Sequence, residues 1–376
     1  MKLLFITTIA QTVNCFLKDL TRLCVERGDS VDIACNQTPD PLDPTFTELG
    51  CGIYQIPFSR SVLSPNNLAA YRQLRALVRR NHYDLVHTHT PNASAITRMA
   101  CRGLRGSGLR VFYTAHGFHF YRGAPKKNWL LFYPAEKLFA RFTDVLITIN
   151  REDEALARKH MKAGKTVYVP GIGLDVRKFS DASVSVPDKR RELGIPGDCF
   201  LVLSIGDLNE NKNHRTVIRA LSMLPKNVHY AVVGEGEGGP ALTECATQLQ
   251  VSDRVHLTGY RMDIPELCHA ADLYVLPSIR EGLNVSLMEA MASGLPCVVS
   301  QARGNAELIT DDRLRCDATD AAGFAEAIRR LLNDPSLAKA AASQNQTQIQ
   351  AFRKEIVLEQ TYELYRQAMQ ETGRPL

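Results

Sequence analysis

Two glutamates, Glu281 and Glu289, lie eight residues apart in the stretch REGLNVSLMEAMASGLPCVVS, which covers residues 280–300. The preceding DLYVLPS predicts a buried strand, and Asn284 then has the residue type and position of a helix N-cap. The backbone amides of the first helical turn have no partner inside the helix. These amides belong to Val285, Ser286 and Leu287. Because they point outward with the positive end of the helix dipole, the pattern predicts an anion site, and phosphate is the expected anion.

The two carboxylates beside this predicted site would compete with a phosphate for the same amides. A carboxylate is, however, a good acceptor for the hydroxyl groups of a sugar. We therefore predict that the amides hold a diphosphate, while Glu281 next to Gly282 and Glu289 inside the helix each bind a flanking sugar. The alternative is an ordinary capped helix with one exposed glutamate and one at the edge of the core.

Length and composition are those of a globular protein with two domains or more, since the 376 residues are 45% hydrophobic and 23% charged. No apolar run reaches the roughly 20 residues that a membrane-spanning helix needs, and the start MKLLFIT is expected to be a first strand rather than a signal peptide. The ten cysteines form no C-x-x-C pair. We expect them to be reduced core residues of a cytoplasmic protein.

The charge is distributed unevenly, although the net charge is only +5. Residues 1–180 contain 25 Lys and Arg against 14 Asp and Glu, a net charge of +11. Residues 181–376 contain 20 against 26, a net charge of −6. The two halves are expected to face different partners, although one half could simply carry more surface lysine and arginine.

Short apolar runs alternate with amphipathic helical patterns, which is typical of parallel sheets covered by helices on both faces. The expected strands are KLLFIT, SVDIAC, YDLVHTH, LRVFYTA and DVLITIN in the first half and FLVLSIG, VHYAVVGEG, RVHLTGY, DLYVLPS and LPCVVS in the second. Residues 169–200, rich in Gly, Pro, Ser and charge, indicate a domain junction. We predict two doubly wound α/β domains, 1–175 and 176–351, and a C-terminal helix at 352–376 that could cross back to the first domain.

Polar segments that follow the strands are candidate binding segments, because such sheets bind ligands at the carboxyl ends of their strands. His116 follows LRVFYTA, and its His-Gly turn would let the backbone approach a ligand closely. A loop histidine hydrogen-bonded to backbone is the alternative. Tyr260 or Arg261, in GYRMD, could stack on a nucleobase, although Tyr260 could equally pack at the edge of the core.

The segment PSIREGLNVSLMEAMASGLPCVVS resembles the signature of the retaining family 4 glycosyltransferases of GT-B fold. VGEGEGG (233–239), VHLTGYRMDIPELCHAADLYVLPS (255–278) and GNAELI (304–309) match that family in order. The N-terminal YTAHGFHFYRGAPKKNWLLFYPAEKLFARFTDVLITIN is closer still to enzymes of bacterial capsule and exopolysaccharide assembly. The resemblance implies two Rossmann-like domains facing across a cleft, the first binding the acceptor and the second the nucleotide sugar.

The resemblance also implies roles for the site residues. The second glutamate of the E-x7-E pair, here Glu289, holds the ribose hydroxyls of a nucleotide sugar, and the first, Glu281, contacts the transferred sugar. The amides around residues 284–287 hold the diphosphate. The histidine that matches His116 contacts the donor sugar and could help to orient the acceptor, with His119 as a further candidate. Neither a metal ion nor a cofactor is needed, and no D-x-D motif occurs at a plausible place.

Two departures from the family pattern concern the loops after the first strand of each domain. GDLNENKNH, which starts at Gly206, has Lys212 in the place of the family lysine but Asp207 in the place of its arginine. One cation is therefore missing, and either Lys212 with the helix amides suffices or another base, Arg280 or Arg215, enters the site. The usual glycine-rich loop after the first strand is replaced by TTIAQTVNCF, in which Asn14 is a candidate contact.

Residues 121–142 mix positive charges with aromatic residues and leucines on an expected helix that begins near Asn128. The cations are Arg122, Lys126, Lys127, Lys137 and Arg141, and the aromatic residues are Trp129, Phe132, Tyr133 and Phe139. Helices of this composition lie on anionic bilayers. We predict a membrane contact here, which the resemblance to enzymes with polyprenyl-diphosphate acceptors favours. The alternative is a buried helix with solvated lysines.

The function predicted from these features is a retaining, metal-independent glycosyltransferase at the inner face of the cell membrane. It would move a hexosyl or N-acetylhexosaminyl unit from a UDP-sugar to a lipid-linked saccharide in capsule, exopolysaccharide or cell-wall glycan synthesis. No nucleic-acid partner is expected. Two alternatives remain: an isomerase resembling UDP-N-acetylglucosamine 2-epimerase, against which the E-x7-E pair argues, and a catalytically silent sugar-nucleotide-binding subunit, for which Asp207 is the one hint.

Overall fold

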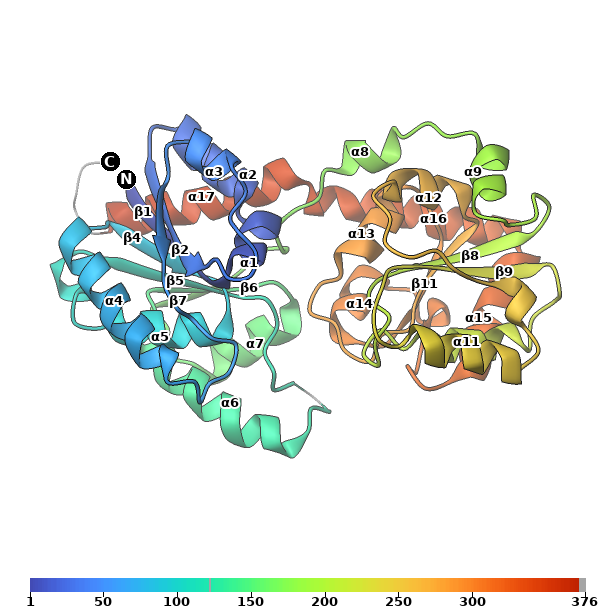
Figure 1. Ribbon diagram of the computed structural model, residues 1–376, viewed down its shortest axis with the longest axis horizontal. Helices are drawn as coiled ribbons and strands as arrows, with labels where there is room; N and C mark the ends of the chain where they lie inside the picture. Colours follow the sequence, from blue (N-terminus) through green and yellow to red (C-terminus); the bar gives the residue numbers. More distant parts are fainter. Residues whose placement is uncertain (122, 372–376) are drawn as a thin grey trace. The chain divides into compact units, whose positions relative to one another are not determined.

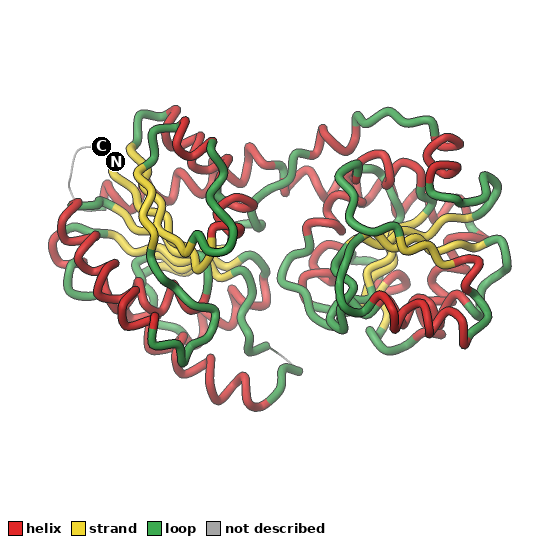
Figure 2. The backbone as a smooth tube through the Cα atoms, viewed as in Figure 1, coloured by secondary structure: helices red, strands yellow, loops and turns green. Residues whose placement is uncertain are grey.

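The computed structural model describes residues 1–121 and 123–371 and divides into two compact units. The N-terminal unit contains Met1–Gly173 and the chain from Glu355 onward, and the C-terminal unit contains Leu174–Lys354. In each unit helices cover both faces of a central sheet (Figure 1, Figure 2). The expectation of two doubly wound α/β sheets with a helical C-terminal region is confirmed.

The sheet of the N-terminal unit has seven strands in the order β3-β2-β1-β4-β5-β6-β7, and every adjacent pair is parallel. The strands are β1 (Lys2–Ile9), β2 (Ser30–Asn36), β3 (Gly52–Gln55), β4 (Leu85–Thr88), β5 (Arg110–Ala115), β6 (Val145–Thr148) and β7 (Lys165–Tyr168). The helices are α1 (Ala10–Phe16), α2 (Lys18–Glu26), α3 (Thr45–Glu48), α4 (Asn66–Asn81), α5 (Pro91–Cys101), α6 (Lys126–Phe139), α7 (Arg151–His160) and α17 (Lys354–Gln370).

The two faces of this sheet have separate cores, because consecutive side chains of a strand point to opposite faces. Leu3 and Phe5 of β1 belong to the cluster that α17 covers, whereas Leu4 and Ile6 belong to the cluster under α4 and α5. The C-terminal helix α17 thus completes the N-terminal unit, with Tyr365 fully buried against β1. Of the predicted helix at 352–376, residues 372–376 lie outside the described residues.

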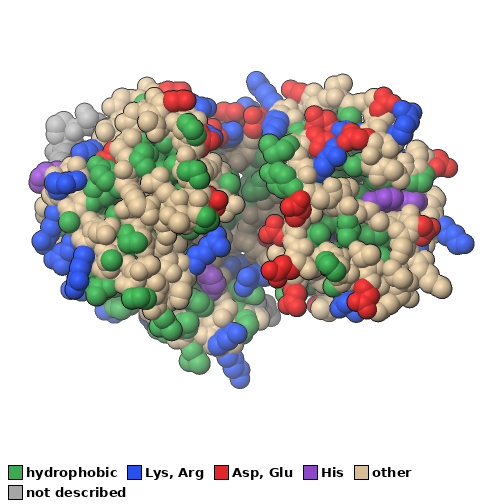
Figure 3. Space-filling view, viewed as in Figure 1, with side chains coloured by type: hydrophobic (Ala, Val, Ile, Leu, Met, Phe, Trp, Pro, Cys, Tyr) green, Lys and Arg blue, Asp and Glu red, His purple; other side chains and the backbone are tan. Residues whose placement is uncertain are grey.

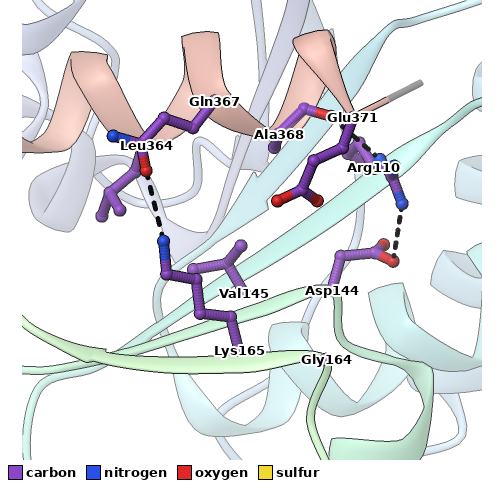
Figure 4. Close-up of a pocket in the computed structure, with 9 residues that line it drawn as sticks. All are labelled: Arg110, Asp144, Val145, Gly164, Lys165, Leu364, Gln367, Ala368 and Glu371. Carbon is purple, nitrogen blue, oxygen red and sulfur yellow. Dashed lines mark hydrogen bonds and ion pairs between the residues drawn. The ribbon is translucent and has the colours of Figure 1, made fainter. Parts of the chain in front are cut away.

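The last turn of α17 lies beside a cavity of about 290 Å³ at the amino ends of β5, β6 and β7 (Figure 4). Arg110 Nε donates to the Ala368 carbonyl at 3.2 Å, and Lys165 Nζ donates to Gln367 Oε1 at 3.2 Å. A cation bound to the last carbonyls of a helix stabilises its end. These contacts dock α17, and they lie at the edge of the sheet opposite the strands' carboxyl ends.

The sheet of the C-terminal unit has six strands in the order β10-β9-β8-β11-β12-β13, again parallel throughout. The strands are β8 (Phe200–Ile205), β9 (Val228–Val233), β10 (Val255–Leu257), β11 (Leu273–Leu276), β12 (Cys297–Ser300) and β13 (Arg315–Cys316). The helices are α8 (Val176–Ser180), α9 (Val186–Glu192), α10 (His214–Leu221), α11 (Gly239–Gln248), α12 (Ile264–Ala270), α13 (Val285–Ala292), α14 (Arg303–Leu308), α15 (Ala321–Asn333) and α16 (Pro335–Ile349).

Each sheet has one point at which the strand order reverses. In the N-terminal unit it lies between β1 and β4, and in the C-terminal unit between β8 and β11. Loops leave such a point in opposite directions, which opens a crevice for a ligand at the carboxyl ends of the strands. We call residues 206–213 the β8 loop and residues 277–284 the β11 loop.

Within the described part of the chain, no helix combines the length and apolar character that crossing a bilayer requires.

Candidate active site

In the C-terminal unit the β8 loop and the β11 loop are joined by hydrogen bonds at the switch point. The Ile279 amide donates to the Asn211 carbonyl at 2.8 Å, and Asn211 Nδ2 donates to the Arg280 carbonyl at 3.1 Å. Asn213, which has a left-handed backbone with φ 55°, donates from Nδ2 to the Pro277 carbonyl. These bonds fix the two loops against each other and set the positions of the side chains between them.

The side chains that these loops bring together are Lys212 and Glu281. Lys212 Nζ lies 2.8 Å from Glu281 Oε1, and both side chains are mostly buried. The lysine stem runs over Gly206, where an added Cβ would lie 3.0 Å from Lys212 Cε. Glycine at this position, with φ 155°, therefore lets the stem lie flat on the backbone. The ammonium group ends at the switch point, paired with the first glutamate of the E-x7-E pair.

The start of α13 has the predicted N-cap. Asn284 Oδ1 accepts from the Leu287 amide at 2.9 Å and from Ser286 Oγ at 2.7 Å. The Leu287 amide, which was predicted to bind the diphosphate, is used by the cap in this structure, and Leu287 is fully buried. The cap leaves the amides of Val285 and Ser286 as the first-turn donors that it does not use.

Glu289, one turn further along α13, is partly buried. Burial raises the pKa of its carboxyl to about 7, while Lys178 acts in the opposite direction. Among the residues that the structure describes, none forms an ion pair or hydrogen bond with this carboxylate. An ionisable group with a shifted pKa and an unfilled set of acceptor positions is typical of a binding site.

The glycines around this site are required by close approach of neighbouring loops. A Cβ at Gly234, in the GEGEGG segment, would lie 2.2 Å from the Gly206 carbonyl oxygen. A Cβ at Gly304 would lie 2.0 Å from the carbonyl oxygen of Gly282, which follows the first glutamate. The glycine-rich turn after β9 is thus explained by packing on the β8 loop.

The two candidates for nucleobase contact, Tyr260 and Arg261, have different surroundings. The Tyr260 side chain is 68% exposed. Arg261 Nε and Nη2 donate to Asp263 at 2.8 and 2.6 Å, and the same guanidinium pairs with Glu192. These carboxylates raise the pKa of Arg261. Arg261 would have to leave two ion pairs to stack on a base, whereas Tyr260 would not.

In the N-terminal unit His116 lies just beyond the carboxyl end of β5. Its ring stacks on Phe16 with centroids 5.3 Å apart, and its Nε2 lies 3.3 Å from Nδ1 of His89, which follows β4. Burial lowers the pKa of His116 to about 4, so the ring is neutral near pH 7.

The other two candidates of this unit have different partners. Asn14 Oδ1 accepts from the Asp43 amide at 2.9 Å, and Asn14 Nδ2 donates to the Pro41 carbonyl at 3.1 Å. Its amide thus holds a neighbouring loop. The His119 ring stacks on Phe132 of α6 with centroids 4.6 Å apart.

Two residues beside these sites were not identified from the sequence. Arg303 Nε lies 3.5 Å from the Glu281 carbonyl oxygen. His89 is the partner of His116. Arg303 and His89 each lie one to three residues after a strand. This position at the carboxyl end of a parallel sheet is the sequence feature that could have identified them as site residues. Arg280, one of the two cations named as a replacement for the missing arginine, is exposed.

Comparisons with known proteins show the family of this chain. The model of the family "Glycosyl transferases group 1" matches residues 185–348, and that of "Glycosyl transferase 4-like domain" matches residues 13–171. The putative glycosyltransferase EpsD of Bacillus subtilis (strain 168) is 35% identical over 373 residues, which are 97% of this chain and 96% of the relative.

A relative from Escherichia coli, the UDP-Gal:alpha-D-GlcNAc-diphosphoundecaprenol alpha-1,3-galactosyltransferase, is 29% identical over 85% of this chain and 81% of its own. Among solved structures, Anabaena Alr3699/HepE in complex with UDP matches with a TM-score of 0.79 at 22% identity, covering 97% of this chain and 99% of that chain. This likeness supports the GT-B fold. From the family models and the match to EpsD, the chain belongs to the group 1 glycosyltransferases, family 4, of GT-B fold.

Proposed function

We propose that this glycosyltransferase moves a hexosyl or N-acetylhexosaminyl unit from a UDP-sugar to a polyprenyl-diphosphate-linked saccharide during exopolysaccharide or related glycan synthesis. The reaction would proceed with retention and without a metal ion. The observation that carries the proposal is the Lys212–Glu281 pair beside the capped start of α13. The names of the relatives support the substrate classes, since the Escherichia coli enzyme is named for a UDP-sugar and a diphosphoundecaprenol acceptor.

The donor diphosphate would bind to the Val285 and Ser286 amides and to Lys212. A diphosphate carries more negative charge than Glu281 and would draw the ammonium group toward itself. This exchange would free the Glu281 carboxylate to accept a hydroxyl of the transferred sugar. Before the donor binds, the Lys212–Glu281 pair keeps both buried charges neutralised, so neither charge is left buried without a partner.

In the transfer step the acceptor oxygen would bond to the anomeric carbon as the bond to the diphosphate oxygen breaks. The acceptor proton would pass to that departing oxygen, so no enzymic nucleophile is needed. Charge builds on the leaving UDP, and Lys212 with the two amides would stabilise it more in the transition state than in the ground state. Glu289 would accept the ribose hydroxyls through its carboxylate, which has no hydrogen-bond partner among the residues that the structure describes.

The cation missing at Asp207 has a candidate replacement in Arg303. Asp207 is exposed, so its own charge is well solvated. Arg303 opens α14 after β12, and its guanidinium reaches the backbone of Glu281. We propose that Arg303 contributes positive charge beside the diphosphate site.

The acceptor side of the proposal rests on the outer face of α6. Leu130, Leu131 and Leu138 are 79%, 60% and 50% exposed, and they are interspersed with exposed lysines. Figure 3 shows green and blue side chains together over the lower part of the N-terminal unit, where Figure 1 places α6. The predicted aromatic contribution is corrected, because Trp129 and Phe132 pack inward under α6. Leucine and lysine, rather than aromatic residues, form the surface, and Arg122 lies outside the described residues.

The wider surface of this unit is basic as well. Between Glu48 and Asp144 the sequence contains 14 Lys and Arg but only two acidic residues, Asp84 and Glu136. Both carboxylates are used internally, since Asp84 accepts from the Lys2 amide and Glu136 pairs with the buried Arg98. The helices α4, α5 and α6 come from this stretch. We propose that they face an anionic membrane surface, which would place the enzyme peripherally at the inner face of the cell membrane.

The test is an assay of the purified chain with UDP-sugars and a polyprenyl-diphosphate-linked saccharide, with the product linkage read by NMR. We expect an elongated lipid-linked saccharide whose new linkage keeps the α configuration of the donor. Interconversion of UDP-N-acetylglucosamine without acceptor would instead identify an isomerase. Binding of UDP-sugars without turnover on any acceptor would identify a silent subunit.

A further inference from the structure

Three histidines lie together at the carboxyl end of the sheet in the N-terminal unit. His87 lies within β4, His89 directly follows that strand, and His116 directly follows β5. The His87 and His89 ring centroids are 4.0 Å apart, and those of His89 and His116 are 5.6 Å apart. His87 and His89 are almost fully buried, whereas His116 is partly exposed.

The first of these rings is held on both sides by hydroxyl groups. His87 Nδ1 lies 2.5 Å from Tyr365 Oη of α17, and Nε2 lies 2.8 Å from Thr114 Oγ1. A hydroxyl group can donate or accept, so both ring nitrogens are satisfied in either tautomer. The His87 ring is therefore held in place against the His89 ring, and it does not determine which nitrogen of His89 is protonated.

Among the residues that the structure describes, His89, unlike His87, does not have hydrogen-bond partners that satisfy both of its neutral tautomers. Its Nδ1 lies 3.3 Å from His116 Nε2, so one of these two nitrogens carries the proton between them. Its Nε2 is buried and has no hydrogen-bond partner within the described residues. A buried N–H without an acceptor is rarer in proteins than a buried acceptor with an unfilled lone pair. The proton of neutral His89 is accordingly on Nδ1, where it has an acceptor.

We propose that His89 is a positioning residue that donates its Nδ1–H to His116 Nε2 and so holds His116 in the Nδ1–H tautomer. His116 Nδ1, which has no partner among the described residues, then offers an N–H donor to a bound sugar oxygen. In this state His116 has no free lone pair and cannot serve as a base. The relevance to transfer rests on the proposed function of His116, but the tautomer does not.

Burial keeps the rings of this histidine cluster neutral. It lowers the pKa of His89 well below its usual range, helped by the neighbouring His87 and His116. It lowers the pKa of His87 to about 3. Among the described residues, the rings in contact with His116 are those of Phe16 and His89, neither of which carries a charge at pH 7.

The direct test is ¹H–¹⁵N correlation NMR on the full chain labelled with ¹⁵N-histidine at pH 7, with His116 assigned from the spectrum of His116→Gln. We expect proton-bearing Nδ1 and proton-free Nε2 for His116. In His89→Phe, which keeps a flat ring against His87 but removes the donor, we expect a mixture of His116 tautomers. Tyr365→Phe is the matched control, since it removes a hydroxyl from the cluster without touching the His89–His116 bond, and it should leave the tautomer unchanged.

A proton on Nε2 of wild-type His116, or an unchanged tautomer in His89→Phe, would overturn the proposal. If His89→Phe fails to fold, the wild-type spectrum alone decides. In the transfer assay we expect kcat/KM to fall about tenfold in His89→Phe, while UDP binding, which depends on the other unit, stays unchanged. Full transfer activity in His116→Ala would refute the proposed role of His116 and leave the tautomer assignment standing.

Discussion

The two candidate ligand sites of this chain differ in the kind of group that lines them. The site of the C-terminal unit is built from charges: Lys212 against Glu281, a helix start with two amides that the N-cap does not use, and Glu289 with a raised pKa. The site of the N-terminal unit is built from neutral rings, with His116 between Phe16 and His89. A charged site suits the diphosphate of a donor, and a neutral one suits the hydroxyl groups of sugars.

The comparison also teaches that net charge does not locate an anion site. The half with net charge −6 contains the diphosphate candidate, because a few oriented amides and one lysine create a local positive potential. The half with net charge +11 has its cations on outer helices instead of at the histidines. These cations suit a broad anionic surface rather than a single phosphate.

The strongest way to break the charged site is Lys212→Ala. We expect kcat/KM for sugar transfer to fall by about 10²–10³, because one preorganised donor to the developing charge on the leaving UDP is lost. Steady-state kinetics with a UDP-sugar donor measures the effect. Lys226→Ala, which removes an exposed lysine of the same unit, is the control and should leave the rate unchanged. Equal rates for Lys212→Ala and the control would remove Lys212 from the mechanism.

The outer face of α6 can be broken by reversing Lys126 and Lys127 to glutamate. Since each near-surface cation contributes about 1 kcal/mol to binding an anionic bilayer, we expect binding to fall at least about 30-fold. Flotation with vesicles containing anionic lipid measures this. The matched control reverses Lys226 and Lys339, two exposed lysines of the C-terminal unit, with the same change in net charge. Identical flotation of both variants would contradict a specific membrane face.

The raised pKa of Glu289 makes donor binding dependent on pH. With a pKa of about 7, the carboxyl is mostly protonated at pH 6 and mostly ionised at pH 8. If the ionised form accepts the ribose hydroxyls, affinity for a UDP-sugar should rise about tenfold between these values. Calorimetry in Glu289→Gln should show weaker binding without this rise. A rise of the same size in the variant would assign the pH dependence to another group.

The same shift predicts an effect on folding. Because the folded pKa lies above the unfolded value near 4.5, the folded chain binds more protons between about pH 4.5 and 7. This contribution to stability is present below pH 4.5 and is lost as the pH rises through 7. Glu289→Gln should therefore raise the free energy of unfolding by about 3 kcal/mol at pH 8 and change it little at pH 4.5. Denaturant unfolding at the two pH values measures both.

The smallest effect is expected at Asp207. Asp207→Arg restores the cation that the family pattern has there, and an exposed charge should raise kcat/KM by no more than about fivefold. If Arg303 supplies the missing charge, Arg303→Ala should lower the rate and Asp207→Arg should largely restore it in the double variant. If Asp207→Arg does not restore the rate in the double variant, Arg303 does not supply the charge that is missing at position 207.

The central strands could be predicted because they are apolar and buried on both faces. The three strands missing from the prediction, β3, β7 and β13, are all at sheet edges. They are short and largely half-exposed, so their sequences GIYQ, KTVY and RC lack an apolar run. An edge strand is specified by its neighbour's hydrogen bonds, which a local pattern does not contain.

The parts of the site that could be predicted are those whose residues all lie in one short segment of the sequence. Asn284 and the two glutamates stand in a single helix start, and the N-cap followed from residue type and position. The pairing of Lys212 with Glu281 joins residues 69 positions apart and depends on the switch point between β8 and β11. The His89–His116 contact likewise depends on β4 lying beside β5. Such contacts are set by strand order, which the sequence pattern alone left open.

The most direct test of this account is a crystal structure of the chain with an intact UDP-sugar, grown in the presence of Mg²⁺. We expect diphosphate oxygens within about 3 Å of the Val285 and Ser286 amides and of Lys212 Nζ, no metal ion between them, and a Glu281 carboxylate turned from Lys212 to the sugar. A diphosphate held elsewhere in the unit, or bridged to the protein by a magnesium ion, would contradict it.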